Sequence, residues 1–188
     1  LGAETQGLIG YWLAQALRNA MPMREVAAVL TQCVVDSDDP AFDKPTKFVG
    51  PVYDEATAHQ LAKEHNWAVS RDGNRWRRVV ASPEPQRIVE AETIRMLTDA
   101  GVLVVCAGGG GVPVIEMASE LRGVEAVIDK DLTGALLAEV LGADALLLLT
   151  DVAGVESDFG RPGSHVIRDT TPSELRTRSF PAGSMGPK

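Results

Sequence analysis

A run of four glycines is the feature of this sequence best suited to binding an anion. Gly108–Gly111 follows, after one residue, the apolar segment Val102–Cys106, which is typical of a buried strand. Glycines at a strand end let backbone N–H groups approach a phosphate closely, and the N-terminus of a following helix adds a favourable dipole. Taken alone, the run is equally compatible with a tight turn that binds nothing.

Two widespread phosphate-binding motifs are absent at these glycines. The dinucleotide fingerprint G-x-G-x-x-G would end on Pro113 or Val114, and the Gly-Lys-Ser/Thr triplet of a P-loop occurs nowhere in the sequence. Asp129 and Asp131 do follow at about the distance of a ribose-binding acid. Because the glycine spacing fails, an oxidoreductase ranks behind the other candidate functions.

A second candidate group is the charged sequence Asp129-Lys130-Asp131, which stands between an apolar segment and a predicted helix. A lysine there can neutralise a transferring phosphoryl group, and a neighbouring carboxylate can orient the lysine and keep it protonated. The alternative is a solvated charge run with a helix cap, and a bare Asp-Lys-Asp favours it. The loop at Gly183–Met185 can likewise bring Lys188 to a phosphate, or can be a flexible tail.

Alternating helices and short apolar strands must position these groups. We expect helices at 8–17, 88–100 and 132–141, and strands at 26–35, 102–106, 124–128 and 145–149. Asp131 is placed to cap the helix 132–141 and Gly142 to end it. A capping box is predicted at Thr171–Glu174. This alternation predicts an α/β fold whose mostly parallel sheet is covered on both faces.

Residues 37–82 differ in character and are interpreted as an inserted lobe. Prolines frame Lys47 near its start, and Asp54 suits the N-cap of a short helix. The Asp-Gly pair at 72–73 lies between the strand-like segments Trp67–Ser70 and Trp76–Val80, which predicts a β-hairpin.

Composition excludes several classes of function. The chain has 188 residues, 45% of them hydrophobic, and a formal net charge of -8. A large basic field for nucleic acid or an anionic membrane is therefore not expected. The longest apolar runs are too short to span a bilayer, and no signal-peptide pattern opens the sequence, so we expect a cytoplasmic protein. Cys33 and Cys106 are expected to be buried free thiols, and no metal-ligand spacing is present.

Several segments, in order and spacing, resemble those of the carbamate kinases of the amino-acid kinase superfamily. The segments are Gly2–Leu13, Pro45–Pro51, Arg77–Pro85, Gly108–Ile115, Gly123–Asp131 and Gly183–Lys188. The resemblance covers essentially the whole chain, and the inserted lobe sets carbamate kinases apart from other amino-acid kinases. It implies a three-layer αβα sandwich with a mostly parallel central sheet, a cytoplasmic homodimer and a place in arginine catabolism.

The activity that the resemblance implies is reversible phosphoryl transfer between carbamoyl phosphate and ADP, giving ATP and carbamate. Mg²⁺ would be held mainly by the phosphates of ATP or ADP rather than by the protein. Two alternatives stay open: another acid kinase of the same superfamily, and a non-catalytic protein that binds nucleotide.

The resemblance also implies roles for individual residues. Lys47 would reach from the lobe toward carbamoyl phosphate, and Lys130 and Lys188 would neutralise the transferring phosphoryl group. Asp131 would orient these lysines. The implied substrate-binding residues are Gly108, Gly109, Gly110 and Gly111, and the implied nucleotide-binding residues are Thr150, Asp151, Val152, Gly183, Ser184 and Met185.

The resemblance further implies one amino-acid kinase domain over 1–188, with a substrate lobe at 37–82 and a nucleotide-binding half at 124–188. The family carries a Gly-Gly-Asn loop and a His-Gly-Asn-Gly-Pro loop that hold phosphates, and neither occurs in this sequence. We therefore expect the chain to be truncated at both ends relative to the family.

Overall fold

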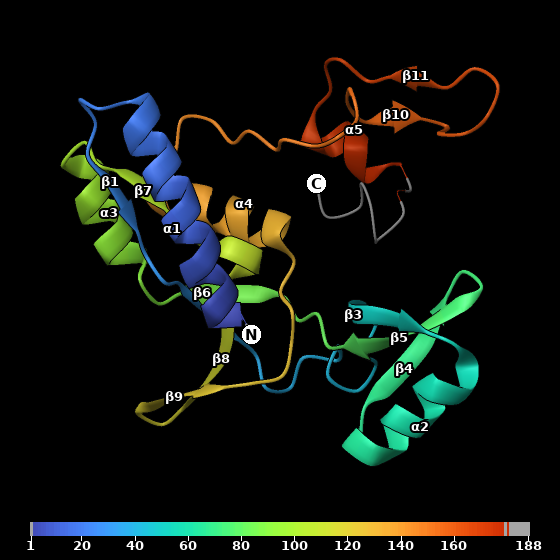
Figure 1. Cartoon of the computed structure of the whole chain (residues 1–188). Coiled ribbons are helices and arrows are strands. Elements are labelled where there is room, and N and C mark those ends of the chain that lie inside the picture. The colour runs from blue at the N-terminus through green and yellow to red at the C-terminus, as the bar shows by residue number, and fades with distance from the viewer. Residues whose placement is uncertain (1, 179, 181–188) are drawn as a thin grey trace. The chain divides into compact units, whose positions relative to one another are not determined.

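The computed structural model describes residues 2–178 and 180 (Figure 1). The chain divides into two compact units, Leu1–Asp144 and Ala145–Lys188, and each is described by itself. The first unit contains helices, parallel and antiparallel strand pairs, and the predicted lobe. The α/β class expected from the sequence is therefore observed within the first unit.

The opening helix, α1 (Gly2–Ala20), packs through its small and polar residues rather than through its large apolar ones. Gln6 and Gly10 are buried. The side chain of Gln6 accepts a hydrogen bond from the Thr31 backbone N–H at 2.9 Å and donates one to the Thr31 carbonyl at 3.0 Å. The large side chains Leu8, Ile9, Trp12 and Leu13 are all exposed. The predicted helix is confirmed and extends beyond 8–17.

The single strand predicted at 26–35 is wrong in one respect, because the structure has two strands there. β1 (Val26–Ala28) pairs in parallel with β7 (Leu103–Val105), the strand predicted before the glycine run. β2 (Gln32–Val35) pairs in parallel with β8 (Val112–Met117). The apolar run is broken because its two halves take different partners on either side of the glycines.

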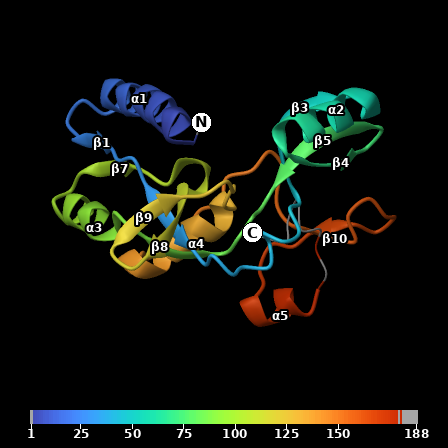
Figure 2. The same cartoon turned by 90° about the horizontal axis from the view of Figure 1, so that it is seen from below.

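The larger sheet has the strand order β6-β2-β8-β9. β6 (Pro85–Ile88) and β9 (Glu120–Gly123) pair antiparallel to β2 and β8. The helix predicted at 88–100 is α3 (Ala91–Asp99), and it begins late because Ile88 ends β6. α3 packs against β7 (Figure 2). The buried core is formed by Cys33, Val35, Ile88, Ile94 and Ile128.

Two predicted strands are wrong. Residues 124–128 form only one isolated parallel bridge, between Ala81 and Ala126, and 145–149 form no strand. An apolar run becomes a strand only when a neighbouring strand offers hydrogen bonds along its length. Leu147 and Leu149 are 80% and 89% exposed, so the second run is not buried within the described residues either.

The predicted lobe is present within 37–82. β3 (Lys47–Tyr53), β5 (Arg75–Val80) and β4 (Ala68–Asp72) form an antiparallel sheet in that order, packed against α2 (Glu55–His65) (Figure 1). The predicted hairpin is confirmed as β4–β5, with Gly73 at φ 62° in its turn. Asp54 caps α2, as predicted, by accepting a hydrogen bond from the Thr57 backbone N–H at 2.9 Å.

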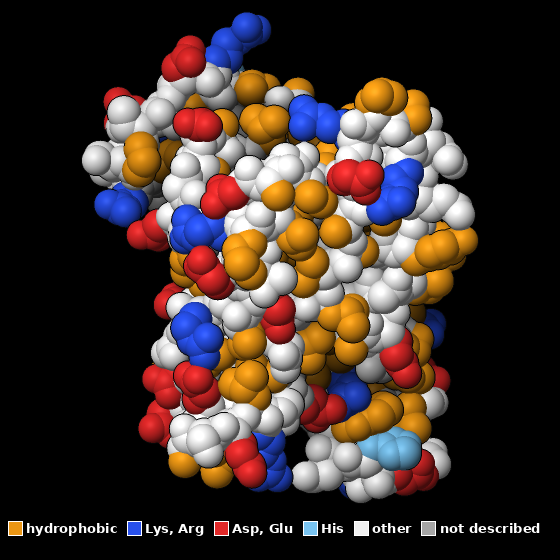
Figure 3. Space-filling view, turned by 90° about the vertical axis from the view of Figure 1, so that its left-hand side faces the viewer, with side chains coloured by type: hydrophobic (Ala, Val, Ile, Leu, Met, Phe, Trp, Pro, Cys, Tyr) orange, Lys and Arg blue, Asp and Glu red, His pale blue; other side chains and the backbone are white. Residues whose placement is uncertain are grey.

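The second unit contains the strands β10 (Glu156–Ser157) and β11 (His165–Val166), which pair antiparallel, and the short helix α5 (Pro172–Arg176). The predicted capping box of Thr171 and Glu174 is confirmed. Figure 3 shows one face of the surface, where hydrophobic side chains are interspersed with charges of both signs. In residues 2–178 and 180, every helix is too short or too polar to cross a membrane.

Candidate functional site

The candidate site is built on the N-terminus of α4 (Lys130–Leu141). The N-cap residue is Asp129, whose Oδ1 accepts a hydrogen bond from the Asp131 backbone N–H at 2.9 Å. The prediction that Asp131 caps this helix is wrong, because the helix begins at Lys130 and Asp131 lies in its first turn. Gly142 ends the helix in the left-handed conformation, as predicted, with φ 64°.

Two lysine–carboxylate pairs meet at this helix end. The Lys130 ammonium lies 2.8 Å from Asp131 Oδ1. The Lys47 ammonium, which comes from the lobe, lies 3.0 Å from Asp129 Oδ2. The Lys130 side chain is 63% exposed while that of Asp131 is 11% exposed, so a partly buried carboxylate holds an accessible cation. An exposed cation held beside a helix N-terminus is an arrangement that favours a bound anion.

The carboxyl group of Asp129 is held in its ionised form. Burial acts to raise its pKa, but the hydrogen bond from Lys47, the backbone N–H of Asp131 and the Lys47 charge outweigh burial and lower the pKa below its ordinary value. Asp129 is therefore negatively charged at neutral pH, and its charge is opposite to that of the Lys47 ammonium.

The predicted glycine run forms the 3₁₀ turn η1 (Gly108–Gly110), with two residues between it and the end of β7. Gly110 has φ +90°, and a Cβ there would lie 2.6 Å from the carbonyl oxygen of Ile128. Gly111 has φ +91°, and its Cβ would lie 2.9 Å from that of Cys33. These two glycines are required for packing, independently of any ligand.

Gly109 differs from its neighbours because it has open space around it. Its φ is +67°, and a Cβ built there meets nothing within 4 Å. The turn is tied to α4 by the buried Thr133 hydroxyl, which donates to the Gly110 carbonyl at 2.9 Å. The glycine run and the charged helix end therefore form one local structure, in which Gly109 is exposed and has room beside it.

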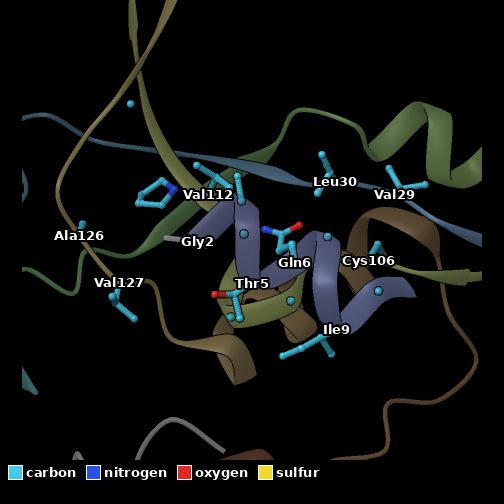
Figure 4. A pocket seen from close by; sticks show the side chains of 18 of the residues that line it. Gly2, Thr5, Gln6, Ile9, Val29, Leu30, Cys106, Val112, Ala126 and Val127 are labelled. Carbon is cyan, nitrogen blue, oxygen red and sulfur yellow. The ribbon is translucent and has the colours of Figure 1, made fainter. Parts of the chain in front are cut away.

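A cavity of about 1030 Å³ lies beside the glycine run. Residues of α1 line it, with Val29, Leu30 and Cys106 on one side and Ala126 and Val127 on the other (Figure 4). Its lining is mostly apolar, and neither Lys47 nor Lys130 contributes to it. The cavity and the paired lysines are therefore separate features. The glycine turn lines the cavity and also contacts the helix that carries Lys130.

The two cysteines are free thiols, as predicted, but only Cys33 is fully buried. Burial raises the pKa of the Cys33 thiol to about 11. Burial also raises the pKa of the half-buried Cys106. Both side chains are consequently protonated thiols at neutral pH rather than nucleophilic thiolates.

The remaining predicted residues lie outside the first unit or outside the described residues. Thr150, Asp151 and Val152 belong to the second unit, where the Thr150 hydroxyl donates to Asp151 Oδ1 at 3.3 Å. The predicted residues Gly183, Ser184, Met185 and Lys188 lie outside the described residues. Their assigned roles stay predictions.

Within residues 2–178 and 180, no cluster of three or more His, Cys, Asp or Glu side chains could hold a metal ion. The two carboxylates nearest the candidate site, Asp129 and Asp131, each face a lysine ammonium. Each of these two carboxylates is thus already engaged by a cation.

Sequence reasoning missed the role of Asp129 in this cluster. It considered Asp129 as a ribose contact and as a member of the charged group around Lys130, whereas the structure shows an N-cap that also binds Lys47. An Asp directly before a predicted helix is a recognisable capping signal. The contact with Lys47 had no sequence signal, since the two residues are 82 positions apart.

Comparison with known proteins adds independent information. Residues 25–188 match the amino acid kinase family. The chain is 53% identical to a carbamate kinase of Pyrococcus horikoshii and 53% identical to one of Rhizobium meliloti, and all of it is aligned in both cases. It spans 62% and 59% of the lengths of these relatives.

A solved structure gives the same result for the fold. The carbamate kinase from Giardia lamblia bound to AMP-PNP superposes with a TM-score of 0.88 at 40% identity, covering 99% of this chain and 62% of that chain. The resemblance noted in the sequence is thus confirmed, and so is the predicted amino-acid kinase fold. The chain belongs to the amino acid kinase family.

Proposed function

We propose that the protein containing this chain is a carbamate kinase, a phosphotransferase that moves a phosphoryl group between carbamoyl phosphate and ADP. The observation that carries the proposal is the convergence of Lys47 and Lys130, each beside its own carboxylate, at the N-terminus of α4. Relatives named carbamate kinase, 53% identical over the whole chain, support the same activity.

In the forward reaction, the bond between phosphorus and the carbamate oxygen breaks while a terminal oxygen of ADP bonds to the same phosphorus. The products are ATP and carbamate. Negative charge is spread over the transferring group throughout, so positioned cations and backbone N–H groups supply most of the catalysis. We assign charge neutralisation to Lys130 and Lys188, and orientation of Lys130 to Asp131.

Lys47 is assigned to carbamoyl phosphate, and Gly108–Gly111 to the substrate side of the site. The open space at Gly109 supports this assignment, because a Cβ built there meets nothing within 4 Å and the turn therefore has room beside it for a substrate group. Gly110 and Gly111 contribute by packing the turn against Ile128 and Cys33.

The nucleotide is assigned to Thr150, Asp151, Val152, Gly183, Ser184 and Met185, and it brings Mg²⁺ with it. Bound Mg²⁺ would neutralise phosphate charge, which is the chemistry that it supplies in phosphoryl transfer. The lysine-paired carboxylates of the described residues support a metal held mainly by the nucleotide.

The proposed organisation is one amino-acid kinase domain over 1–188, with the substrate lobe at 37–82, a nucleotide-binding half at 124–188 and a homodimeric assembly. The antiparallel sheet and helix within 37–82 support the lobe as a distinct substructure. Analytical ultracentrifugation of the full-length protein tests the homodimer, which should sediment at twice the mass of one chain.

The test is ATP formation by the full-length protein, coupled to a reporter enzyme, with ADP, Mg²⁺ and a panel of phosphoryl donors. We expect carbamoyl phosphate to be the preferred donor by a wide margin over acetyl phosphate. Preference for another acyl phosphate would assign the protein to a different acid kinase, and absence of transfer from any donor would contradict a kinase function.

A further inference from the structure

Asp129 uses both of its carboxylate oxygens, and it uses them for different parts of the molecule. Oδ1 accepts the hydrogen bond that caps α4, at 2.9 Å, and Oδ2 contacts the Lys47 ammonium at 3.0 Å. The Asp129 side chain is 15% exposed and that of Lys47 is 37% exposed. One largely buried carboxylate therefore joins the lobe to the helix that carries Lys130.

Capping alone does not require a charge at this position. Asn and Ser cap helices as well as Asp does, because one side-chain oxygen is sufficient. The second oxygen and the negative charge of Asp129 are left to account for, and the atom that faces them is the nitrogen of Lys47. The contact with Lys47 is thus the feature that distinguishes Asp129 from any other N-cap.

The backbone around Lys47 is held independently at the same place. Lys47 begins β3 and pairs with Val80 at the end of β5. The next residue, Ala81, forms a parallel bridge with Ala126 and accepts a hydrogen bond from the Val127 backbone N–H at 2.9 Å. The root of the lobe is therefore fixed beside the segment that leads into Asp129, which leaves the Lys47 side chain as the part that needs orienting.

An ammonium group has three N–H donors, so Lys47 can keep one bond to Asp129 and direct the others at an anion. Without a carboxylate partner, a four-carbon side chain that is more than one third exposed would sample many rotamers. Holding a lysine in one orientation before the substrate arrives reduces the entropic cost of binding and improves alignment.

We propose that Asp129 is a positioning residue that orients Lys47 toward the phosphoryl donor at the N-terminus of α4, an inference that rests on the proposed function for its substrate. Asp129 acts through Lys47 and does not itself contact the donor. The hydrogen bond from the Asp131 backbone N–H to Asp129 holds the two lysine–carboxylate pairs at a fixed distance from each other.

The kinetic experiment uses Asp129→Asn in the full-length protein. The amide oxygen of Asn still caps α4, while the charge that holds Lys47 is removed. We expect kcat/KM for carbamoyl phosphate to fall by about tenfold or more, since small misplacements of catalytic groups have effects of this order. KM for ADP should stay within about twofold of wild type. The matched control is Asp54→Asn, the same change at the cap of α2, which should leave both constants unchanged.

A double variant separates positioning from a structural role. If Asp129 acts through Lys47, then Asp129→Asn should have little further effect on kcat/KM in a Lys47→Ala background. A full additional loss in that background would overturn the proposal, because it would show that Asp129 acts independently of Lys47. Equal kinetics of Asp129→Asn and wild type would overturn it as well.

A second readout does not depend on activity. Acylation of lysine side chains by an amine-reactive ester, followed by mass spectrometry, reports how firmly each ammonium group is held. In Asp129→Asn, labelling of Lys47 should rise several-fold relative to the lobe reference Lys63, since a side chain released from its carboxylate partner samples more rotamers that the ester can reach. Unchanged labelling of Lys47 refutes the positioning role. Increased labelling in a protein without carbamate kinase activity would refute the proposed function while retaining the contact between Asp129 and Lys47.

Discussion

Replacing Gly110 by Ala should destabilise the first unit far more than the same change one residue earlier. At Gly110, a Cβ would lie 2.6 Å from the Ile128 carbonyl oxygen and the residue would keep φ +90°. A non-glycine residue in such a conformation costs roughly 1–3 kcal/mol, and overpacking a tight contact costs roughly another 1–3 kcal/mol. The expected loss of unfolding free energy is therefore roughly 2–6 kcal/mol.

Gly109→Ala is the matched control within the same turn. Gly109 has φ +67° and open space around it, so the change should cost only the conformational penalty, about 1–2 kcal/mol. Urea unfolding of the two variants and wild type, followed by far-UV circular dichroism, gives the three unfolding free energies.

The contact between Gly110 and Ile128 also affects the candidate site. Ile128 immediately precedes Asp129, so any relaxation around a Cβ at position 110 shifts the N-cap of α4 together with Lys130. We expect Gly110→Ala to lower kcat as well as stability. If its unfolding free energy lies within about 1 kcal/mol of that of Gly109→Ala, the packing role assigned to Gly110 is refuted.

The other predictions concern charge. Lys47→Ala should raise KM for carbamoyl phosphate and leave ADP affinity, measured by calorimetry, nearly unchanged; equal damage to both would contradict its assignment to the donor. Lys188→Ala should lower kcat by about a hundredfold with little change in KM, and near-normal turnover would remove it from the mechanism. The lowered pKa of Asp129 means that its charge stabilises the folded state above its ordinary carboxyl pKa, and that this contribution is lost as pH falls through the lower folded value. The stability gap between wild type and Asp129→Asn should therefore close in acid, and a gap that widened there would have the wrong sign.

Short-range signals in the sequence predicted local structure well. The caps at Asp54 and Thr171, the helix end at Gly142 and the β4–β5 hairpin all depend on residues a few positions apart. Their geometry is determined by side chains that bond to nearby backbone, so the pattern contains the information that is needed.

The failures share a different cause. The segments 124–128 and 145–149 are apolar enough for strands, but strand formation depends on a partner that the segment itself does not specify. α3 begins later than predicted for the same reason, because Ile88 pairs with Cys33 of β2 and is therefore part of a strand. Local propensity was overridden by contacts between distant residues.

The candidate site shows both effects. The Asp129-Lys130-Asp131 sequence indicated a charged helix start, and the structure added that each of the two carboxylates holds a different lysine. The pairing of Lys47 with Asp129 depends on how the lobe joins the segment 126–129, which no local pattern in the sequence encodes.

In the proposed function, a positioned lysine at the N-terminus of α4 promotes phosphoryl transfer from carbamoyl phosphate. The decisive experiment measures ATP formation from ADP and carbamoyl phosphate in full-length wild type, Lys130→Ala and the surface control Lys63→Ala. We predict efficient turnover by wild type and Lys63→Ala, and a loss of about a hundredfold or more in kcat for Lys130→Ala. Turnover by Lys130→Ala equal to that of wild type would contradict the claim.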